Sequence, residues 1–521
     1  VSSTREAALT SLSNARSRGF DECFERSAAK WAAWWRDMDI QLTGDEFAQT
    51  VIRFNQYHNI IATPTHADHL PLGARGLSCQ AYQGAAFWDQ EMFNMRTFLL
   101  TRPEVARNIL IYRGRTIDGA RKKARDLGYQ GAFYAWVSGD TGEEICPSYF
   151  FKDVLTGRKI RNHFNDWQIH ISPDISYAIR RYAAVTGDTE YLLEYGAEIV
   201  LEVARFLTSR VHYRLDREQF EIIRVLGPDE YHENVDNNFF TNYQARFALE
   251  YAVEVSEWLR REEPGRWNGL QRQLNLQDSE ISRWDEIAKK IFVPEPDPDT
   301  LLIEQFKGFW EHEDITPERL KERLKDPGEY WGWPNGIAVA TQVSKQADVT
   351  QLFMLHPTAY SLKVMRANWE YYEARTQHGS SLSPAVYAIT AAWVDHTDEA
   401  VRYFRKATTV DLFNEAKAVS GGTFIGGIHT AACGVVWQIV TTGFAGVYLV
   451  DGGFGFSPRM PAEWKEVRFA LKRFGRRLRV TVTPQGLTFE ADSDNDDALT
   501  VEVGDQQTIV EPGASARITH S

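Results

Sequence analysis

The sequence contains little cysteine, no long apolar run and no excess of positive charge. Its four cysteines, Cys23, Cys79, Cys146 and Cys433, lie far apart and form no CxxC pair, which argues against a zinc site or a disulfide framework. No run of about 18 apolar residues occurs, so the sequence predicts no membrane span. The formal net charge of −13 disfavours general nucleic-acid binding, which needs a basic surface.

Several motifs that mark particular chemistries are also missing. The sequence has no Walker loop, no Rossmann glycine fingerprint, no HExxH pair and no GxSxG elbow. It also has no carboxylate cluster of the kind that binds a metal, so neither a metal nor an organic cofactor is expected. The first residues, VSSTREAALTSL, lack the basic and apolar regions of a signal peptide. Together with the sparse cysteines, this favours a reducing compartment, and we expect a cytoplasmic protein.

Helical periodicity dominates the first four fifths of the chain. Apolar residues recur at spacings of three and four in 5–38, 87–120, 174–210, 239–261, 276–292, 345–365 and 383–396. Between these segments lie long loops rich in Gly, Pro, Trp and Asp, at 128–148, 226–238, 294–316, 326–336, 372–384 and 419–429. This alternation predicts stacked helical hairpins in a barrel of paired helices, whose loops gather at one end and form the site.

The pattern changes after Asp451. Apolar and polar residues alternate around Gly475 and Gly486, and they alternate again from Leu499 to Val510. Such alternation is typical of short antiparallel strands with one buried face. We therefore expect a small β domain at the end of the chain.

One loop is unusually rich in carboxylates. Its sequence, GPDEYHENVDNN over 227–238, places Asp229, Glu230, Glu233 and Asp236 just ahead of a predicted helix. Its composition alone equally suits a solvated loop that caps the helix. Cleavage of a glycosidic bond needs a carboxylic acid that protonates the leaving oxygen, so the loop is also a candidate for a general acid.

Two other segments suit a sugar-binding site. In FWDQEMF, Asp89 follows Trp88, so that a carboxylate can accept hydrogen bonds from two hydroxyls while the indole stacks on the sugar ring. In SKQAD, Lys345 and Gln346 can bond sugar hydroxyls or simply lie in solvent. Exposed Trp-Asp pairs are common, so neither segment is specific on its own.

A pair of loops suggests an anion site. HGSSLSP begins with His378 and opens a predicted helix, and GGIHTA carries His429 at the start of another. Hydroxyls and backbone N–H groups at a helix N-terminus attract an anion. Helix capping explains each loop taken alone, but together they supply two histidines and several hydroxyls, including those of Ser380 and Ser381, to one oxyanion.

Taken in order along the chain, these segments resemble glycoside hydrolase family 65, the inverting disaccharide phosphorylases. The matching stretches extend from about residue 30 to 470 and read FWDQE, TGEEICP, QIHISPDISYAI, GPDEYHENVDNN, IEQFKGF, KQADV, HGSSLSP and GGIHTA. The resemblance implies a mainly α fold with linker helices over 1–45, an (α/α)6 catalytic barrel over 46–450 and a small C-terminal β domain over 451–521. It also implies an N-terminal β-sandwich, which this chain lacks and which we expect to precede residue 1 or to be a separate chain.

The resemblance also assigns roles to the candidate residues. It makes Glu230 the general acid and implies that the glucosyl unit is bound by Trp88, Asp89, Lys345 and Gln346. Phosphate would be bound by His378, Ser380, Ser381 and His429. The implied substrates are an α-glucosyl disaccharide and inorganic phosphate, and inversion would give β-glucose 1-phosphate and the free acceptor. The family's frequent dimerism favours a homodimer.

Three activities stay open. In a phosphorylase, phosphate is itself the nucleophile, and a carboxylate base opposite Glu230 would repel the dianion. An inverting α-glucosidase on the same fold would need such a base, about 6.5–9.5 Å from the acid, and Glu370 and Glu373 lie just before the HGSSLSP loop. The third possibility is a non-catalytic carbohydrate-binding subunit, which the missing β-sandwich suggests. Linkage and acceptor also stay open, and we expect loops near 66–76, 130–146 and 326–336 to set them.

Overall fold

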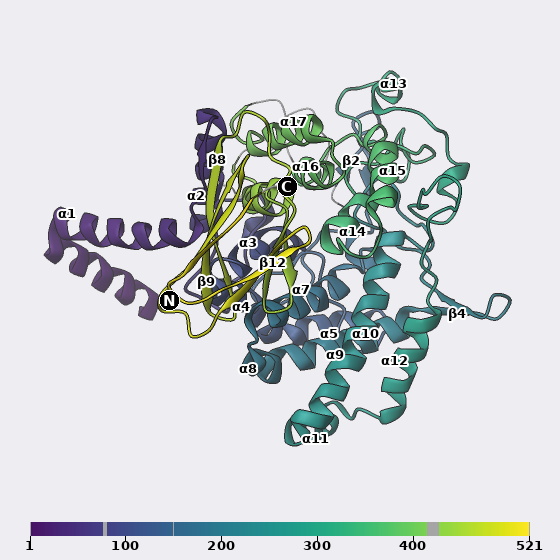
Figure 1. Cartoon of the computed structure of the whole chain (residues 1–521). Coiled ribbons are helices and arrows are strands. Elements are labelled where there is room, and N and C mark those ends of the chain that lie inside the picture. The colour runs from purple at the N-terminus through teal and green to yellow at the C-terminus, as the bar shows by residue number, and fades with distance from the viewer. Residues whose placement is uncertain (1, 77–80, 150, 414–426, 520–521) are drawn as a thin grey trace.

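The computed structural model describes residues 2–76, 81–149, 151–413 and 427–519. Helices and long loops account for most of the chain as far as residue 446, and a domain of β-strands follows (Figure 1). The sequence prediction of a mainly helical chain with a C-terminal sheet domain is therefore confirmed. Within the described ranges, no helix is both long enough and apolar enough to cross a membrane. Cys23, Cys146 and Cys433 are free thiols, and Cys79 lies outside the described residues.

One set of helical segments contributes much of the buried interior of the helical domain. It consists of η2 (Gln90–Asn94) continued by α3 (Met95–Leu99), α7 (Ile171–Thr186), α10 (Phe239–Glu262), α14 (Val349–Leu355), α16 (Ser383–Trp393) and α18 (Thr430–Gln438). Every residue of α14 and of α18 is buried. A helix that is buried all round lies inside a protein, as α14 and α18 do here, whereas α7 and α10 each bury one face in the interior of the helical domain.

These inner segments contact one another in sequence order. η2 touches α7, α7 touches α10, α10 touches α14, α14 touches α16, α16 touches α18, and α18 returns to η2 and α3. Outer helices pack against them with one apolar face each: α2 (Glu46–Ala62), α4 (Pro103–Arg115), α9 (Ala197–Arg210), α12 (Asp278–Lys290), α15 (Leu362–Glu373) and α17 (Thr397–Thr408). Along the chain, one outer helix comes before each inner segment.

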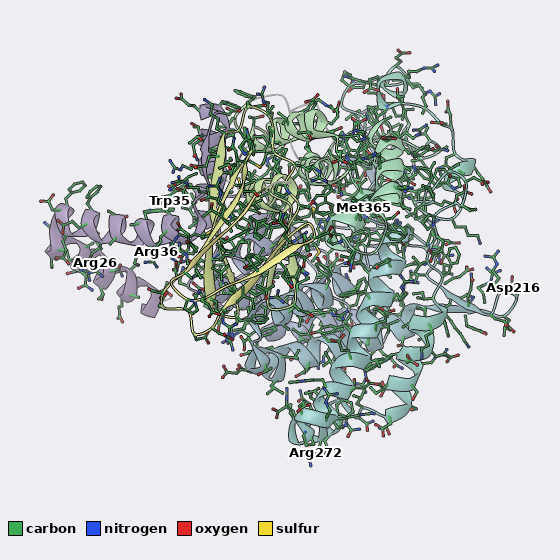
Figure 2. All side chains as sticks on the ribbon, viewed as in Figure 1. Arg26, Trp35, Arg36, Asp216, Arg272 and Met365 are labelled. Carbon is green, nitrogen blue, oxygen red and sulfur yellow. The ribbon has the colours of Figure 1, made fainter. Side chains whose placement is uncertain are left out.

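The remaining helical elements are short or peripheral. They are η1 (Ala81–Gly84), α5 (Ile117–Asp126), α6 (Phe164–Trp167), α8 (Thr189–Tyr191), η3 (Leu192–Gly196), α11 (Pro264–Leu274), η4 (Phe309–Glu311), α13 (Pro317–Lys321) and η6 (Ile439–Phe444). Helix α1 (Ser2–Met38) breaks at Gly19, whose φ is +78°, and its two halves extend away from the body with Arg26 near their far end (Figure 2).

The C-terminal domain consists of two sheets. One has the order β1-β8-β9-β10-β13, and the other has the order β12-β11-β7-β6. The strands are β1 (Gln41–Thr43), β6 (Val447–Val450), β7 (Gly453–Phe456), β8 (Glu466–Arg473), β9 (Arg476–Thr483), β10 (Gly486–Ala491), β11 (Leu499–Val503), β12 (Gln506–Val510) and β13 (Ser515–Thr519). The predicted hairpins are antiparallel as expected, whereas β7 and β11 pair in parallel.

Two small hairpins lie outside this domain: β2 (Phe151–Lys152) with β3 (Lys159–Ile160), and β4 (His212–Arg214) with β5 (Gln219–Glu221). β1 comes from the segment before α2 and pairs with β8, so the start of the chain and the C-terminal domain share one sheet.

Candidate active site

A cavity of about 330 Å³ lies where the inner helices begin. Residues that precede five of these segments line it: Trp88 and Asp89 before η2, Glu230 before α10, Lys345 and Gln346 before α14, Gly379 to Leu382 before α16, and His429 before α18. Residues as far apart in the sequence as Trp88 and His429 thus meet in one place. Of the nine residues to which the family resemblance assigned a role, all but His378 line this cavity.

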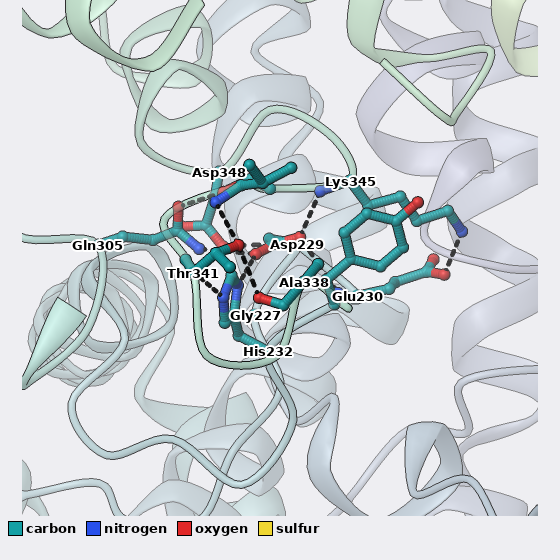
Figure 3. Close-up of polar contacts among 12 residues, drawn as sticks. Gly227, Asp229, Glu230, His232, Gln305, Ala338, Thr341, Lys345 and Asp348 are labelled. Atoms are coloured by element: carbon teal, nitrogen blue, oxygen red, sulfur yellow. Dashed lines mark hydrogen bonds and ion pairs between the residues drawn. The ribbon is translucent and has the colours of Figure 1, made fainter. Parts of the chain in front are cut away.

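Asp229 fixes the backbone of the acid loop. Its carboxylate accepts hydrogen bonds from the backbone N–H of Lys345 (2.7 Å), from that of Tyr231 (3.2 Å) and from Nε2 of Gln305 (2.9 Å), and it lies 2.5 Å from Nδ1 of His232 (Figure 3). Burial opposes ionisation of Asp229, but the nearby His232 and these hydrogen bonds outweigh burial and lower its pKa. Asp229 therefore ties the acid loop to the Lys345 segment and positions Glu230 without lining the cavity.

A second buried carboxyl, Asp348, supports the same junction. It accepts hydrogen bonds from the backbone N–H of Asp229 (3.2 Å) and from Nδ2 of Asn238 (3.1 Å), the residue that caps α10. Burial, followed by the charge of Asp229, raises the pKa of Asp348 to about 7. A Cβ at Gly227 would lie 2.6 Å from Oδ2 of Asp348, so the packing requires glycine there.

Glu230 is the carboxylate of the acid loop that reaches the cavity. Its side chain is 15% exposed, and its Oε2 lies 2.5 Å from Nζ of Lys345 (Figure 3). Its backbone carbonyl accepts a hydrogen bond from the Tyr330 hydroxyl at 2.9 Å. Gln346 donates to the carbonyl of Pro228 from the same side. The predicted acid and two predicted sugar ligands thus form one contiguous polar wall.

Trp88 and Asp89 form a second wall. Trp88 is 3% exposed, and its ring makes edge-on contacts with His170, just before α7, and with Phe240 on α10, which fix its plane. Burial, together with a smaller effect of the charge of Glu230, raises the pKa of Asp89 to about 7 against the opposing charge of Arg75. Near neutral pH the Asp89 carboxyl therefore exchanges readily between its neutral and ionised forms.

Another part of the cavity wall, here called the anion end, is suited to an anion. Gly379, Ser380 and Ser381 line it at the start of α16, and His429 lines it at the start of α18. Both helices run for more than two turns, so their N-termini add positive potential there. Arg75 also lines the cavity, with its Nη1 3.3 Å from Nδ1 of His429.

A buried carboxylate orients His429. Oδ1 of Asp411 lies 2.6 Å from Nδ1 of His429, and Oδ2 accepts a hydrogen bond from the His429 backbone N–H at 2.8 Å. Nε2 of the same ring is buried and has no hydrogen-bond partner in the described part of the chain. With Nδ1 held by Asp411, Nε2 is the atom available to a ligand. Gly426, at the start of the predicted GGIHTA loop, lies outside the described residues.

The side chain of His378, a predicted phosphate ligand, does not line the cavity. Its Nδ1 lies 3.0 Å from Oγ of Ser383, and its Nε2 lies 2.8 Å from the Tyr403 hydroxyl. Burial lowers the pKa of His378 well below its ordinary value, so the imidazole is neutral. These contacts anchor one end of the loop that presents Ser380 and Ser381. The next residue, Gly379, anchors it further, because its backbone N–H donates a hydrogen bond to the Lys345 carbonyl at 2.8 Å.

The two carboxylates that could have opposed Glu230 point elsewhere. Oε1 of Glu370 lies 2.9 Å from Nε2 of His396, and Glu373 accepts hydrogen bonds from Arg402 and Tyr403, both at 2.7 Å. Neither residue lines the cavity, and Asp89 and Glu230 are the acids among its described lining residues. The described residues also contain no group of three or more potential metal ligands.

Two family models match this chain. Residues 53–438 match the glycosyl hydrolase family 65 central catalytic domain, and residues 449–510 match the C-terminal domain of the same family. The chain therefore belongs to glycosyl hydrolase family 65.

Two proteins similar to this chain are named as phosphorylases. A 1,2-α-glucosylglycerol phosphorylase of Bacillus selenitireducens is 50% identical over 505 residues, covering 97% of this chain and 65% of the relative. A kojibiose phosphorylase of Halothermothrix orenii is 38% identical, covering 92% of this chain and 60% of the relative. The chain thus spans less than two thirds of these curated relatives. A solved structure described as a putative kojibiose phosphorylase from the human microbiome matches with a TM-score of 0.86 and 25% identity, covering the whole chain and 72% of its own.

Asp89→Asn is expected to stabilise the fold at alkaline pH. Because the folded-state pKa of Asp89 is raised to about 7, folding favours the protonated form, and stability is lost as pH rises from about 4 through 7. Removing that cost should raise the free energy of unfolding at pH 8 by about 2–4 kcal/mol. Urea denaturation at pH 8 and pH 5 measures this, and the gain should shrink markedly at pH 5. An equal gain at both pH values would show that burial of the charge is not its cause.

Proposed function

We propose that this chain catalyses the phosphorolysis of an α-glucoside with inversion, giving β-glucose 1-phosphate and the free acceptor. We also propose that the inner and outer helices form an (α/α)6 barrel, which the cyclic contacts of the inner segments support. Family membership and the phosphorylase names of the relatives support the proposed phosphorolysis. Inorganic phosphate would be the co-substrate, with no other cofactor, in the cytoplasm.

One observation carries the proposal: a single cavity holds a carboxyl group for proton donation and, elsewhere on its wall, an anion site with no acid among the described residues that line it. Glu230 supplies the carboxyl, while Ser380, Ser381, His429 and Arg75 supply hydroxyls, an imidazole and a guanidinium. Such donors attract a phosphate dianion, whereas a carboxylate among them would repel it.

These positions suggest the following reaction course. The glucosyl ring lies between Trp88 and the polar wall, with Asp89 accepting hydrogen bonds from its hydroxyls. Glu230 gives its proton to the glycosidic oxygen, the bond from that oxygen to the anomeric carbon breaks, and the acceptor leaves as an alcohol. A phosphate oxygen bonds to the anomeric carbon from the opposite face, which inverts its configuration. Sugar hydroxyls that draw Lys345 away from Glu230 would favour the protonated acid that this course requires.

The relatives suggest which substrate to test first. The one at 50% identity is named for 1,2-α-glucosylglycerol, so we propose this glucoside as the leading candidate and kojibiose as the second. Val137, Ile145, Cys146 and Pro147 also line the cavity. The first three belong to the 130–146 loop predicted to set the acceptor, Pro147 follows it directly, and we propose that all four contact the acceptor.

A substrate panel tests the proposal. Incubation of the chain with 1,2-α-glucosylglycerol, kojibiose, nigerose, maltose and trehalose, each with and without phosphate, should give glucose 1-phosphate from at least one glucoside and only when phosphate is present. Free glucose at the same rate without phosphate would instead indicate an inverting α-glucosidase. Binding of a glucoside with no product under either condition would indicate a carbohydrate-binding subunit.

One observation favours the α-glucosidase as the second candidate. Asp89 shares the cavity with Glu230, and a carboxyl group with a pKa of about 7 is well suited to take a proton from water. The same panel decides between the two activities, because only the hydrolase turns over without phosphate.

A further inference from the structure

A second cavity, of about 540 Å³, lies between the helical and C-terminal domains. Its walls come from the later turns of inner helices, with Leu99 on α3, Arg181 on α7 and Trp437 on α18, and from Tyr448 on β6. Since the candidate active site lies where the same helices begin, the two cavities occupy opposite ends of the inner helices. We call this second space the interdomain cavity.

Four arginines line the interdomain cavity, and two of them are neutralised. Arg180 pairs with Glu254 at 2.8 Å, and Arg459 pairs with Asp395 at 2.6 Å. The acid in the lining, Glu91, does not offset the other two arginines, because it is already held by Arg113 through hydrogen bonds of 2.7 and 3.0 Å.

The other two arginines, Arg96 and Arg181, have no acidic partner within the described residues. Nη2 of Arg96 is 3.5 Å from the carbonyl of Met354, and its Nη1 is buried without a hydrogen-bond partner. Arg181 makes no ion pair or hydrogen bond to that part of the chain. Burial of part of the Arg96 guanidinium without an anion is unfavourable, and the half-buried Arg181 faces the same space with a second positive charge.

The pKa of a histidine in the cavity wall reflects both burial and the positive potential of this cavity. Burial, followed by the charges of Arg181 and Arg96, lowers the pKa of His356 to about 3. The imidazole is therefore neutral at pH 7, with its Nε2 2.7 Å from Oε1 of Gln244. The cavity thus disfavours a further cation on its own wall and favours an anion.

The rest of the wall is mostly apolar. Leu99, Leu355, Trp393 and Met365, the last labelled in Figure 2, contribute aliphatic and aromatic surface. Pockets of about 300–1,000 Å³ with apolar walls and a few charged groups are typical of sites for small organic ligands. A bare inorganic ion would leave this surface unused.

We propose that the interdomain cavity binds an organic anion, in which a carboxylate, sulfonate or phosphate ester contacts Arg96 and Arg181 and an apolar body fills the remaining space. The proposal does not depend on the activity proposed for the other cavity.

A fluorescent aromatic sulfonate, 8-anilinonaphthalene-1-sulfonate, tests the proposal, with uncharged N-phenyl-1-naphthylamine as the matched probe. Loss of one charge-assisted contact should weaken binding of the sulfonate about tenfold or more in Arg181→Met and in Arg96→Met. Binding of the uncharged probe should change little in either variant. Arg272→Met, on the exposed surface of α11, is the control for loss of one positive charge and should leave both probes unaffected (Figure 2).

Two variants keep the test decisive. Arg181 makes no ion pair or hydrogen bond to the described part of the chain, so Arg181→Met removes no such contact and remains informative even if Arg96→Met is unstable. Ser381→Ala, in the other cavity, should leave sulfonate binding unchanged. Absence of sulfonate binding, equal affinity in wild type and Arg181→Met, or loss of binding in Ser381→Ala would each overturn the proposal.

Discussion

Replacing Glu230 by glutamine is expected to reduce turnover of the natural glucoside by about 10²–10⁴-fold. Glutamine keeps the size of the side chain but has no proton to give to the leaving oxygen. A poor leaving group, such as an alkoxide of glycerol, depends on that proton most. Initial rates of glucose 1-phosphate release by wild type and Glu230→Gln measure the effect, and an α-glucosyl donor with a good leaving group should lose much less.

The matched control is Glu233→Gln in the same loop. Glu233 is 3% exposed, both its carboxylate oxygens lack hydrogen-bond partners among the described residues, and it does not line the cavity. Burial raises its pKa to about 8, so it is largely neutral at pH 7 and glutamine replaces it with little change in charge. Glu233→Gln should keep activity within a few-fold. A large loss in Glu233→Gln with near-normal turnover in Glu230→Gln would move the acid to Glu233.

His429→Ala is expected to raise the KM for phosphate roughly ten- to a hundredfold while changing the KM for the glucoside far less. Its Nε2 is the ring nitrogen left for a ligand, since Asp411 holds Nδ1 at 2.6 Å. Ser381→Ala should act in the same direction. Initial rates across a grid of phosphate and glucoside concentrations separate the two constants.

Two variants check this interpretation of His429. Asp411→Asn keeps the imidazole but weakens its orientation, so its effect on the KM for phosphate should be in the same direction and smaller. His212→Ala, on the exposed β4 hairpin, should change neither constant. Equal increases in both KM values for His429→Ala would mean that His429 maintains the fold of the loop and does not bind the anion.

The elements of the fold could be predicted because their periodicities are local. The spacing of apolar residues in α7 and α10 and the alternation in β8, β9 and β10 each reflect one buried face. The parallel pairing of β7 with β11 could not be predicted in this way, because it joins strands that lie more than 40 residues apart.

Within the acid loop, composition did not separate the four carboxylates, but their surroundings do. Asp229 is buried and saturated with hydrogen bonds, Glu233 is buried outside the cavity, and Asp236 accepts a hydrogen bond from the backbone N–H of Arg224 at 3.0 Å. Glu230 alone of the four lines the cavity. The resemblance to the family had assigned it the role of acid, and the packing of its neighbours explains why the other three are unsuited.

The positions of three side chains in and around the anion end could not be predicted from the sequence. His378 has a φ of +56°, in the left-handed region, and its ring contacts Ser383 and Tyr403 instead of lining the cavity. The sequence of a motif does not reveal the backbone angles of its residues, so the direction of the His378 side chain could not be predicted. Arg75 and Asp411 stand in no recognisable pattern, and only the fold brings them to His429, from more than 350 and from 18 residues away.

The dependence of turnover on phosphate tests the central claim most directly. The initial rate of consumption of 1,2-α-glucosylglycerol, or of the best glucoside in the panel, should be measured as phosphate is lowered to zero, with early products followed by NMR. The account predicts that the rate falls to zero without phosphate and that the first product is the β-anomer of glucose 1-phosphate. A rate that persists without phosphate and yields free glucose would contradict it.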